Sequence, residues 1–148
     1  MTEIKKICVI DGQGGGIGSA IISRLKDIFE ETVEIYALGT NAIATAQMLK
    51  SKANRGASGE NAIVQTVRKA DIVIGPIGII IPHAMMGEVT PKMAESVSMS
   101  PAKKILLPLS QENIVFPGVA PLPLPQLVDE IIHKHLKHYQ KKEEQNGS

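Results

Sequence analysis

Short runs of isoleucine, valine and leucine alternate along this chain with stretches whose apolar residues recur at helical spacing. The runs occupy residues 4–10, 33–38, 71–75 and 103–109, and the third is continuous in isoleucine and valine, as a strand covered on both faces is. Parallel strands are joined by crossover helices, so strand and helix in alternation predict a parallel sheet. We expect an α/β fold, a small doubly wound parallel sheet of four or five strands with helices on both faces.

Helical periodicity and helix-start signals fill the intervals between these strands. The expected helices cover residues 17–29, 42–50, 60–68, a segment that begins at Thr90-Pro91, and 127–139. Thr90 suits a helix cap and Pro91 suits the first helical position. Residues 52–59 are expected to form a turn-rich connection, and residues 113–116 are a candidate fifth strand. The four main strands, counted in chain order, should pair in the order 2-1-3-4.

The composition is that of an ordinary globular domain. The 148 residues are 43% hydrophobic and 21% charged, so we expect a single domain over residues 1–140 and a polar, flexible tail over residues 141–148. With 16 basic and 15 acidic residues the net charge is +1, and no bulk charge favours nucleic acid or a membrane surface. Aromatic residues make up 3%, too few for a surface that stacks single-stranded nucleic acid.

The distribution of apolar segments along the chain predicts a cytoplasmic location. No apolar segment suited to a secretory signal precedes the first polar turn, and the longest uncharged stretch, residues 72–87, is interrupted by glycine and proline. The single cysteine, Cys8, lies inside the first apolar run and is expected to be a buried thiol.

The stretch DGQGGGIG, residues 11–18, holds five glycines in eight positions between the first expected strand and the first helix. Glycine lets a backbone approach a ligand closely, and a helix N-terminus offers free N–H groups and the positive end of its dipole. Phosphate or carboxylate is the natural occupant. The candidate binding residues are those of the whole stretch: Asp11, Gly12, Gln13, Gly14, Gly15, Gly16, Ile17 and Gly18. The alternative is that the glycines only make a tight turn from strand to helix.

Gly12, Gly16 and Gly18 follow the spacing G-x-x-x-G-I-G, which resembles the cofactor loop of short-chain dehydrogenases. The catalytic tyrosine and lysine of that family are absent, because neither tyrosine of this chain has a lysine four positions later. Asp11 also departs from that loop, since a carboxylate there would repel a pyrophosphate. We expect Asp11 either to accept hydrogen bonds from the N–H groups of its own loop or to hold a divalent cation that bridges to a phosphate.

The second expected strand ends in ALGTNA, at the same edge of the sheet. Dinucleotide-binding folds usually place an acid here that bonds the ribose hydroxyls, and this segment has none. Thr40 and Asn41, with Arg55 to help, suit a phosphorylated ribose better than a bare one, which makes NADP the candidate cofactor and another nucleotide the alternative. An equal alternative is that Thr40 and Asn41 only cap the following helix.

A third segment, GPIGIIIPHAMMGE, follows the third strand. Its first residues are further candidates for ligand binding: Gly75, Pro76, Ile77 and Gly78. Residues 79–81 cannot all face inward on a regular strand, so they line an apolar pocket or, as we favour, a contact between subunits of a homo-oligomer through residues 77–87. His83 is the candidate catalytic acid or base, with Glu88 as the nearest carboxylate in the sequence; a structural histidine is the alternative.

Three further histidines, His133, His135 and His138, lie in the last expected helix. Their spacing does not place two ligands on one helical face, so we expect a solvated helix end and no metal site.

Along most of residues 7–109 the chain resembles a family of small bacterial proteins of unknown function. The likeness rests on VIDGQGGGIG, ALGTNAIATAQMLK, GASGENAIV, ADIVIGPIGIII, GEVTPKMAE and KKILLPL. It implies a Rossmann-like single domain, and it carries over no activity and no catalytic residue.

Three hypotheses of function follow, and whether the protein is an enzyme stays open. The favoured one is a protein that binds a nucleotide or another phosphorylated ligand at residues 11–18. The alternatives are an NADP-dependent oxidoreductase with its substrate near His83 and a structural or regulatory subunit without a ligand.

Overall fold

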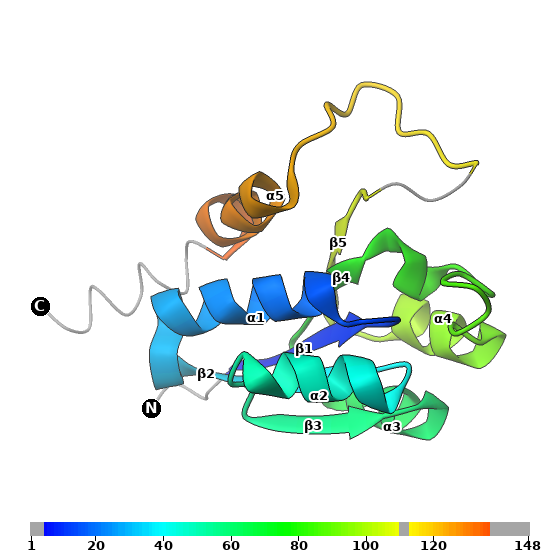
Figure 1. Ribbon diagram of the computed structural model, residues 1–148, viewed down its shortest axis with the longest axis horizontal. Helices are drawn as coiled ribbons and strands as arrows, with labels where there is room; N and C mark the ends of the chain where they lie inside the picture. The colour runs from blue at the N-terminus through cyan, green and yellow to red at the C-terminus, as the bar shows by residue number, and fades with distance from the viewer. Residues whose placement is uncertain (1–4, 110–112, 137–148) are drawn as a thin grey trace, which may run out of the picture.

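The computed structural model describes residues 5–109 and 113–136. Its centre is a five-stranded parallel sheet in the order β3-β2-β1-β4-β5, and Figure 1 shows helices on both sides of it. The strands are β1 (Lys5–Asp11), β2 (Val33–Gly39), β3 (Arg55–Ser58), β4 (Ile72–Pro76) and β5 (Lys103–Leu107). The α-helices are α1 (Gly16–Phe29), α2 (Ala42–Lys50), α3 (Glu60–Thr66), α4 (Pro91–Met99) and α5 (Leu124–Glu130). Short 3-10 segments are η1 (Glu30–Thr32), η2 (Val67–Lys69) and η3 (Ile77–Ile80), and η4 (Ile131–His135) is a π-helix.

Two hydrophobic cores cover the two faces of the sheet. Successive side chains of a strand point to opposite faces. Ile7 and Val9 of β1 accordingly belong to the core formed with α1, α2 and α5, whereas Cys8 and Ile10 belong to the core formed with α3, η3 and α4. The central strands carry aliphatic residues at consecutive positions because both faces are buried.

The expected fold class and strand order are confirmed. The predicted order 2-1-3-4 is the observed β2-β1-β4-β5, and the helix predicted over residues 42–50 is α2. The connection expected at residues 52–59 was wrong in part, because it contains the edge strand β3, which pairs with β2. All four residues of β3 are exposed, so no apolar pattern marks it. Residues 113–116 form no strand.

The last helix differs from the expected one. It begins as α5 at Leu124, within the proline-rich stretch of residues 119–126, with Pro125 in its first turn, and changes to the π-helix η4 at Ile131. The predicted continuation to residue 139, His138 and the expected tail lie outside the described residues. No helix in the described part of the chain is both long enough and apolar enough to cross a membrane.

Candidate functional site

Three loops leave the carboxyl ends of the central strands. β1 runs into the glycine loop, residues 11–18; β2 runs into Thr40 and Asn41; and β4 runs into η3 and the segment 81–90 that precedes α4. β2 and β4 flank β1 in the sheet. The chain therefore runs from β1 to β2 on one side of β1 and later crosses to β4 on the other side of β1. Such a reversal of strand order opens the crevice in which α/β proteins bind ligands.

Asp11, the last residue of β1, turns its carboxylate into the glycine loop and is 3% exposed. Its Oδ1 accepts a hydrogen bond from the Gly12 N–H at 2.8 Å, and its Oδ2 accepts one from the Gly18 N–H at 2.7 Å. Burial raises the pKa of Asp11, the hydrogen bonds of the loop lower it in part, and the charge of Glu88 raises it further. Of the two roles considered for Asp11, these contacts match the first, a carboxylate that holds its own loop.

The position of Asp11 limits what the start of α1 can bind. Because the Gly18 N–H is already used, an incoming anion cannot reach it, and a buried carboxylate lies beneath the loop. Within residues 5–109 and 113–136, no three His, Cys, Asp or Glu side chains are grouped to hold a metal ion.

Three glycines of the loop are required by the packing of the protein itself. Gly15 has a φ of 76°, and a Cβ there would lie 2.7 Å from the carbonyl oxygen of Ala44. A Cβ on Gly18 would overlap the side chain of Met48, and one on Gly12 would overlap side chains of the two neighbouring loops. The close approach of α1 to α2 and of the three loops to one another explains these glycines.

Gly14 and Gly16 have no such explanation. A Cβ on either would have no heavy atom within 4 Å, and neither residue has a positive φ. Both are exposed, and their N–H groups have no acceptor among the described residues. Exposed backbone therefore lies at Gly14, in the loop before α1, and at Gly16, the first residue of α1.

Thr40 and Asn41 join the second loop to the glycine loop. Asn41 caps α2, because its Oδ1 accepts a hydrogen bond from the Ala44 N–H at 2.8 Å, and this confirms the capping interpretation for that residue. Its Nδ2 donates to the Gln13 carbonyl oxygen at 3.1 Å. The Thr40 N–H donates to the Asp11 carbonyl oxygen at 3.0 Å. The structure therefore brings these predicted residues together.

Glu88, from the third loop, links all three loops. Its Oε1 accepts hydrogen bonds from the Gln13 N–H at 2.8 Å, the Thr40 hydroxyl at 2.7 Å and the Asn41 side-chain amide at 2.8 Å. Burial raises the pKa of Glu88, but these three hydrogen bonds outweigh it and leave the pKa below its usual value. Its Oε2 makes no hydrogen bond with any residue in the described ranges.

Sequence reasoning missed this role of Glu88. It named Glu88 only as the carboxylate nearest to His83 in the sequence, whereas the carboxylate lies against Thr40 and Asn41. An acid therefore does stand at the end of β2, although it comes from another loop, and the premise that favoured NADP fails. The available signal was that Glu88 is the one carboxylate between Asp71 and residue 95.

His83 lies in a turn with unusual backbone geometry. His83, Met85 and Met86 have φ values of 68°, 57° and 57°, in the left-handed region that non-glycine residues seldom adopt. The His83 N–H donates to the Val89 carbonyl oxygen, and its exposed side chain has no hydrogen bond or ion pair with a described residue. A catalytic role for His83 stays a prediction.

The candidate residues at the end of β4 and the start of η3 are mostly buried. A Cβ on Gly75 would lie 2.5 Å from the Ile10 carbonyl oxygen, so close pairing with β1 explains that glycine. Ile79, in η3, is 1% exposed, and its expected place in a subunit contact was wrong because it packs into the core of its own chain. A homo-oligomer through residues 77–87 stays a prediction. The buried residues of this stretch are Gly75, Pro76, Gly78 and Ile79, and the half-buried ones are Ile77, Ile80 and Ile81.

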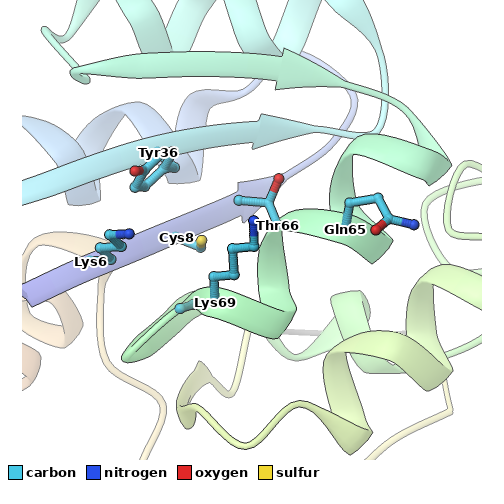
Figure 2. A pocket seen from close by; sticks show the side chains of 7 residues that line it. Lys6, Cys8, Tyr36, Gln65, Thr66 and Lys69 are labelled. Carbon is cyan, nitrogen blue, oxygen red and sulfur yellow. The ribbon is translucent and has the colours of Figure 1, made fainter.

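A separate cavity of about 310 Å³ lies beside η2, against β1 and β2. It is lined by Lys6, Cys8, Tyr36, Gln65, Thr66, Lys69 and Ala70, and Figure 2 shows the Cys8 sulfur between the side chains of Lys6 and Lys69. Burial, with the charge of Asp71, raises the pKa of Cys8 to about 12. The expected buried thiol is confirmed, and it stays protonated at neutral pH. None of the residues predicted to bind a ligand lines this cavity.

Comparisons with other proteins give a family and two likenesses of fold. The model of a family described as "Domain of unknown function (DUF3842)" matches residues 6–140. No curated protein matches the chain. One similar solved structure is a universal stress protein in complex with cAMP, at 18% identity and a TM-score of 0.42, over 72% of this chain and 98% of that one. Another is a putative epimerase from Bacteroides thetaiotaomicron, at 18% identity and a TM-score of 0.45, over 92% and 66% of the two chains.

Proposed function

We propose, for a chain that belongs to the DUF3842 family of unknown function, that it binds a nucleotide or another phosphorylated small molecule in the crevice at the glycine loop. The pair Gly14 and Gly16 carries the proposal. Neither packing nor backbone conformation requires glycine at these positions. A ligand that must touch the bare backbone accounts for both.

The N–H groups of Gly14 and Gly16 suit a phosphoryl group. They have no acceptor among the described residues, and they lie at the start of α1, whose 14 residues direct the positive end of a helix dipole at the crevice. Asp11 restricts the site, because its carboxylate accepts the hydrogen bond of the Gly18 N–H and places a negative charge beside the loop. The phosphoryl group is therefore held by the outer part of the loop, and its affinity rises when Asp11 is protonated.

Thermal unfolding with ATP, GTP, NADH, NADPH or inorganic phosphate tests the proposal. A ligand at one hundred times its Kd adds about 2.7 kcal/mol, which raises the Tm of a domain of this size by roughly 5 to 10 °C. Gly16→Val should fold and lose the shift, since the new side chain meets open space and covers the loop. Ala46→Val, at an exposed position of α2, is the matched control and should keep it. A wild-type protein that responds to no ligand, or a full shift in Gly16→Val, contradicts the proposal.

No specific observation favours the NADP-dependent oxidoreductase. The His83 side chain has no orienting partner among the described residues, and Arg55, the expected helper of a phosphorylated ribose, pairs with Glu34 at 3.4 Å.

A further inference from the structure

An acid stands at the end of β2 although β2 does not supply it. In many doubly wound folds the residue that bonds the ribose hydroxyls follows the second strand. In this chain that place is taken by Glu88, which comes from the loop after β4, 75 residues beyond Gln13. The three donors from the other two loops hold the carboxylate there.

The two oxygens of Glu88 differ in a way that points to a ligand. All three hydrogen bonds fall on Oε1, so the orientation of the carboxylate is set by protein donors. Oε2 has no partner among the described residues, and the carboxylate is ionised at neutral pH because its pKa lies below the usual value. An ionised oxygen held at a crevice accepts hydrogen bonds from ligand hydroxyl groups.

We infer that the ligand presents a bare vicinal diol, such as the 2′- and 3′-hydroxyls of an unphosphorylated ribose, to Oε2 of Glu88. The inference rests on the proposed function, in which the phosphoryl group of the same ligand lies on Gly14 and Gly16. Gln13, which holds Glu88, directly precedes Gly14 and is three residues from Gly16. Consecutive Cα atoms lie about 3.8 Å apart, so the Cα atoms of Gly14 and Gly16 lie at most about 4 and about 11 Å from that of Gln13.

The same geometry disfavours a phosphorylated ribose. A phosphate monoester carries about −1.5 to −2 charges at neutral pH, and at the 2′ position it would face the Glu88 carboxylate. Arg55, the cation that could have offset this charge, is paired with Glu34. Glu88 therefore selects for the free diol and against the 2′-phosphate.

Three ligands that differ only at the 2′ position test the inference: AMP, 2′-deoxy-AMP and adenosine 2′,5′-bisphosphate. Calorimetric titration of the full chain should give the lowest Kd for AMP. A hydrogen bond to a charged group is worth about 10- to 100-fold in affinity, so 2′-deoxy-AMP should bind weaker by that factor. The bisphosphate should bind weaker still. Ribose 5-phosphate and 2-deoxyribose 5-phosphate repeat the comparison without the base and show whether the diol belongs to a nucleotide or to a sugar phosphate.

The variant Glu88→Gln keeps the size of the side chain and an oxygen for the donors of Oε1. It should reduce the preference for AMP over the bisphosphate by about tenfold, while Glu95→Gln, at an exposed position of α4, leaves the preference unchanged. Equal affinity for AMP and 2′-deoxy-AMP, or tightest binding of the bisphosphate, overturns the inference and leaves the proposed function standing. If none of the five ligands binds, the inference falls, and the thermal unfolding series with ATP, GTP, NADH, NADPH and phosphate decides the proposed function by itself.

Discussion

Replacing Gly15 by alanine tests the division between glycines that the fold requires and glycines that it does not. Gly15 has a φ of 76°, and a Cβ there lies 2.7 Å from the carbonyl oxygen of Ala44. The left-handed conformation disfavours an L-residue by roughly 1–2 kcal/mol, and forcing an extra methyl into a packed contact adds about 1–3 kcal/mol. We therefore expect Gly15→Ala to lower the free energy of unfolding by about 2–5 kcal/mol.

Gly16→Ala, one position along, is the comparison. No atom lies within 4 Å of the new methyl group, and the backbone is already in a region open to alanine. Alanine is a better helix former than glycine by up to about 1 kcal/mol, so we expect the free energy of unfolding to stay the same or to rise by less than that.

Urea unfolding followed by circular dichroism measures both variants against the wild type. The slope of the free energy against urea should not change, which would show that the two-state comparison holds. A loss in Gly16→Ala as large as that in Gly15→Ala would show that the fold needs Gly16, and the argument for a ligand at the bare backbone would then fail. A neutral Gly15→Ala would show that the loop does not have the conformation described.

Three further predictions concern other parts of the molecule. The pKa of Asp11 is raised in the folded state, so its protonated form stabilises the fold. This stabilisation is complete below the ordinary pKa of 3.8 and is lost as pH rises through the raised pKa. Urea unfolding at a series of pH values should show this loss in the wild type and not in Asp11→Asn. Thr90→Ala removes the cap of α4, which accepts from the Met93 N–H at 3.2 Å, and should lower the free energy of unfolding by about 1 kcal/mol. If residues 77–87 form a subunit contact, Ile80→Lys should lower the mass measured by light scattering, and a monomeric wild type at micromolar concentration would contradict the contact.

The central strands could be predicted because burial on both faces requires apolar side chains at consecutive positions. β4 shows this most simply, since all five of its residues are buried. β3 could not be predicted for the opposite reason. It is a four-residue edge strand whose side chains are all exposed, so its pairing with β2 through the backbone leaves no trace in residue type. Ile79 was misplaced because η3 is a 3-10 turn, whose side chains do not alternate as those of a strand do.

The candidate site likewise contains some features that the sequence predicts and one that it does not. The glycine loop and the cap at Asn41 are local features, in which neighbouring residues supply the contacts, and their positions followed from spacing alone. Glu88 reaches the loop only through a turn in which His83, Met85 and Met86 adopt positive φ values. None of these residue types signals such a conformation. The contact between Glu88 and the glycine loop was therefore outside the reach of sequence reasoning.

The hydrogen bonds to Glu88 have a consequence for the order in which the three loops come together during folding. They join residues separated by 75, 48 and 47 positions, so they require the chain to have crossed from β3 over to β4. An intermediate that contains β1, β2 and the glycine loop without β4 lacks the Glu88 carboxylate at the end of β2. A ligand that uses this acid would bind the completed sheet only, and it would slow hydrogen exchange in β4 and in the segment 81–90 as well as global unfolding.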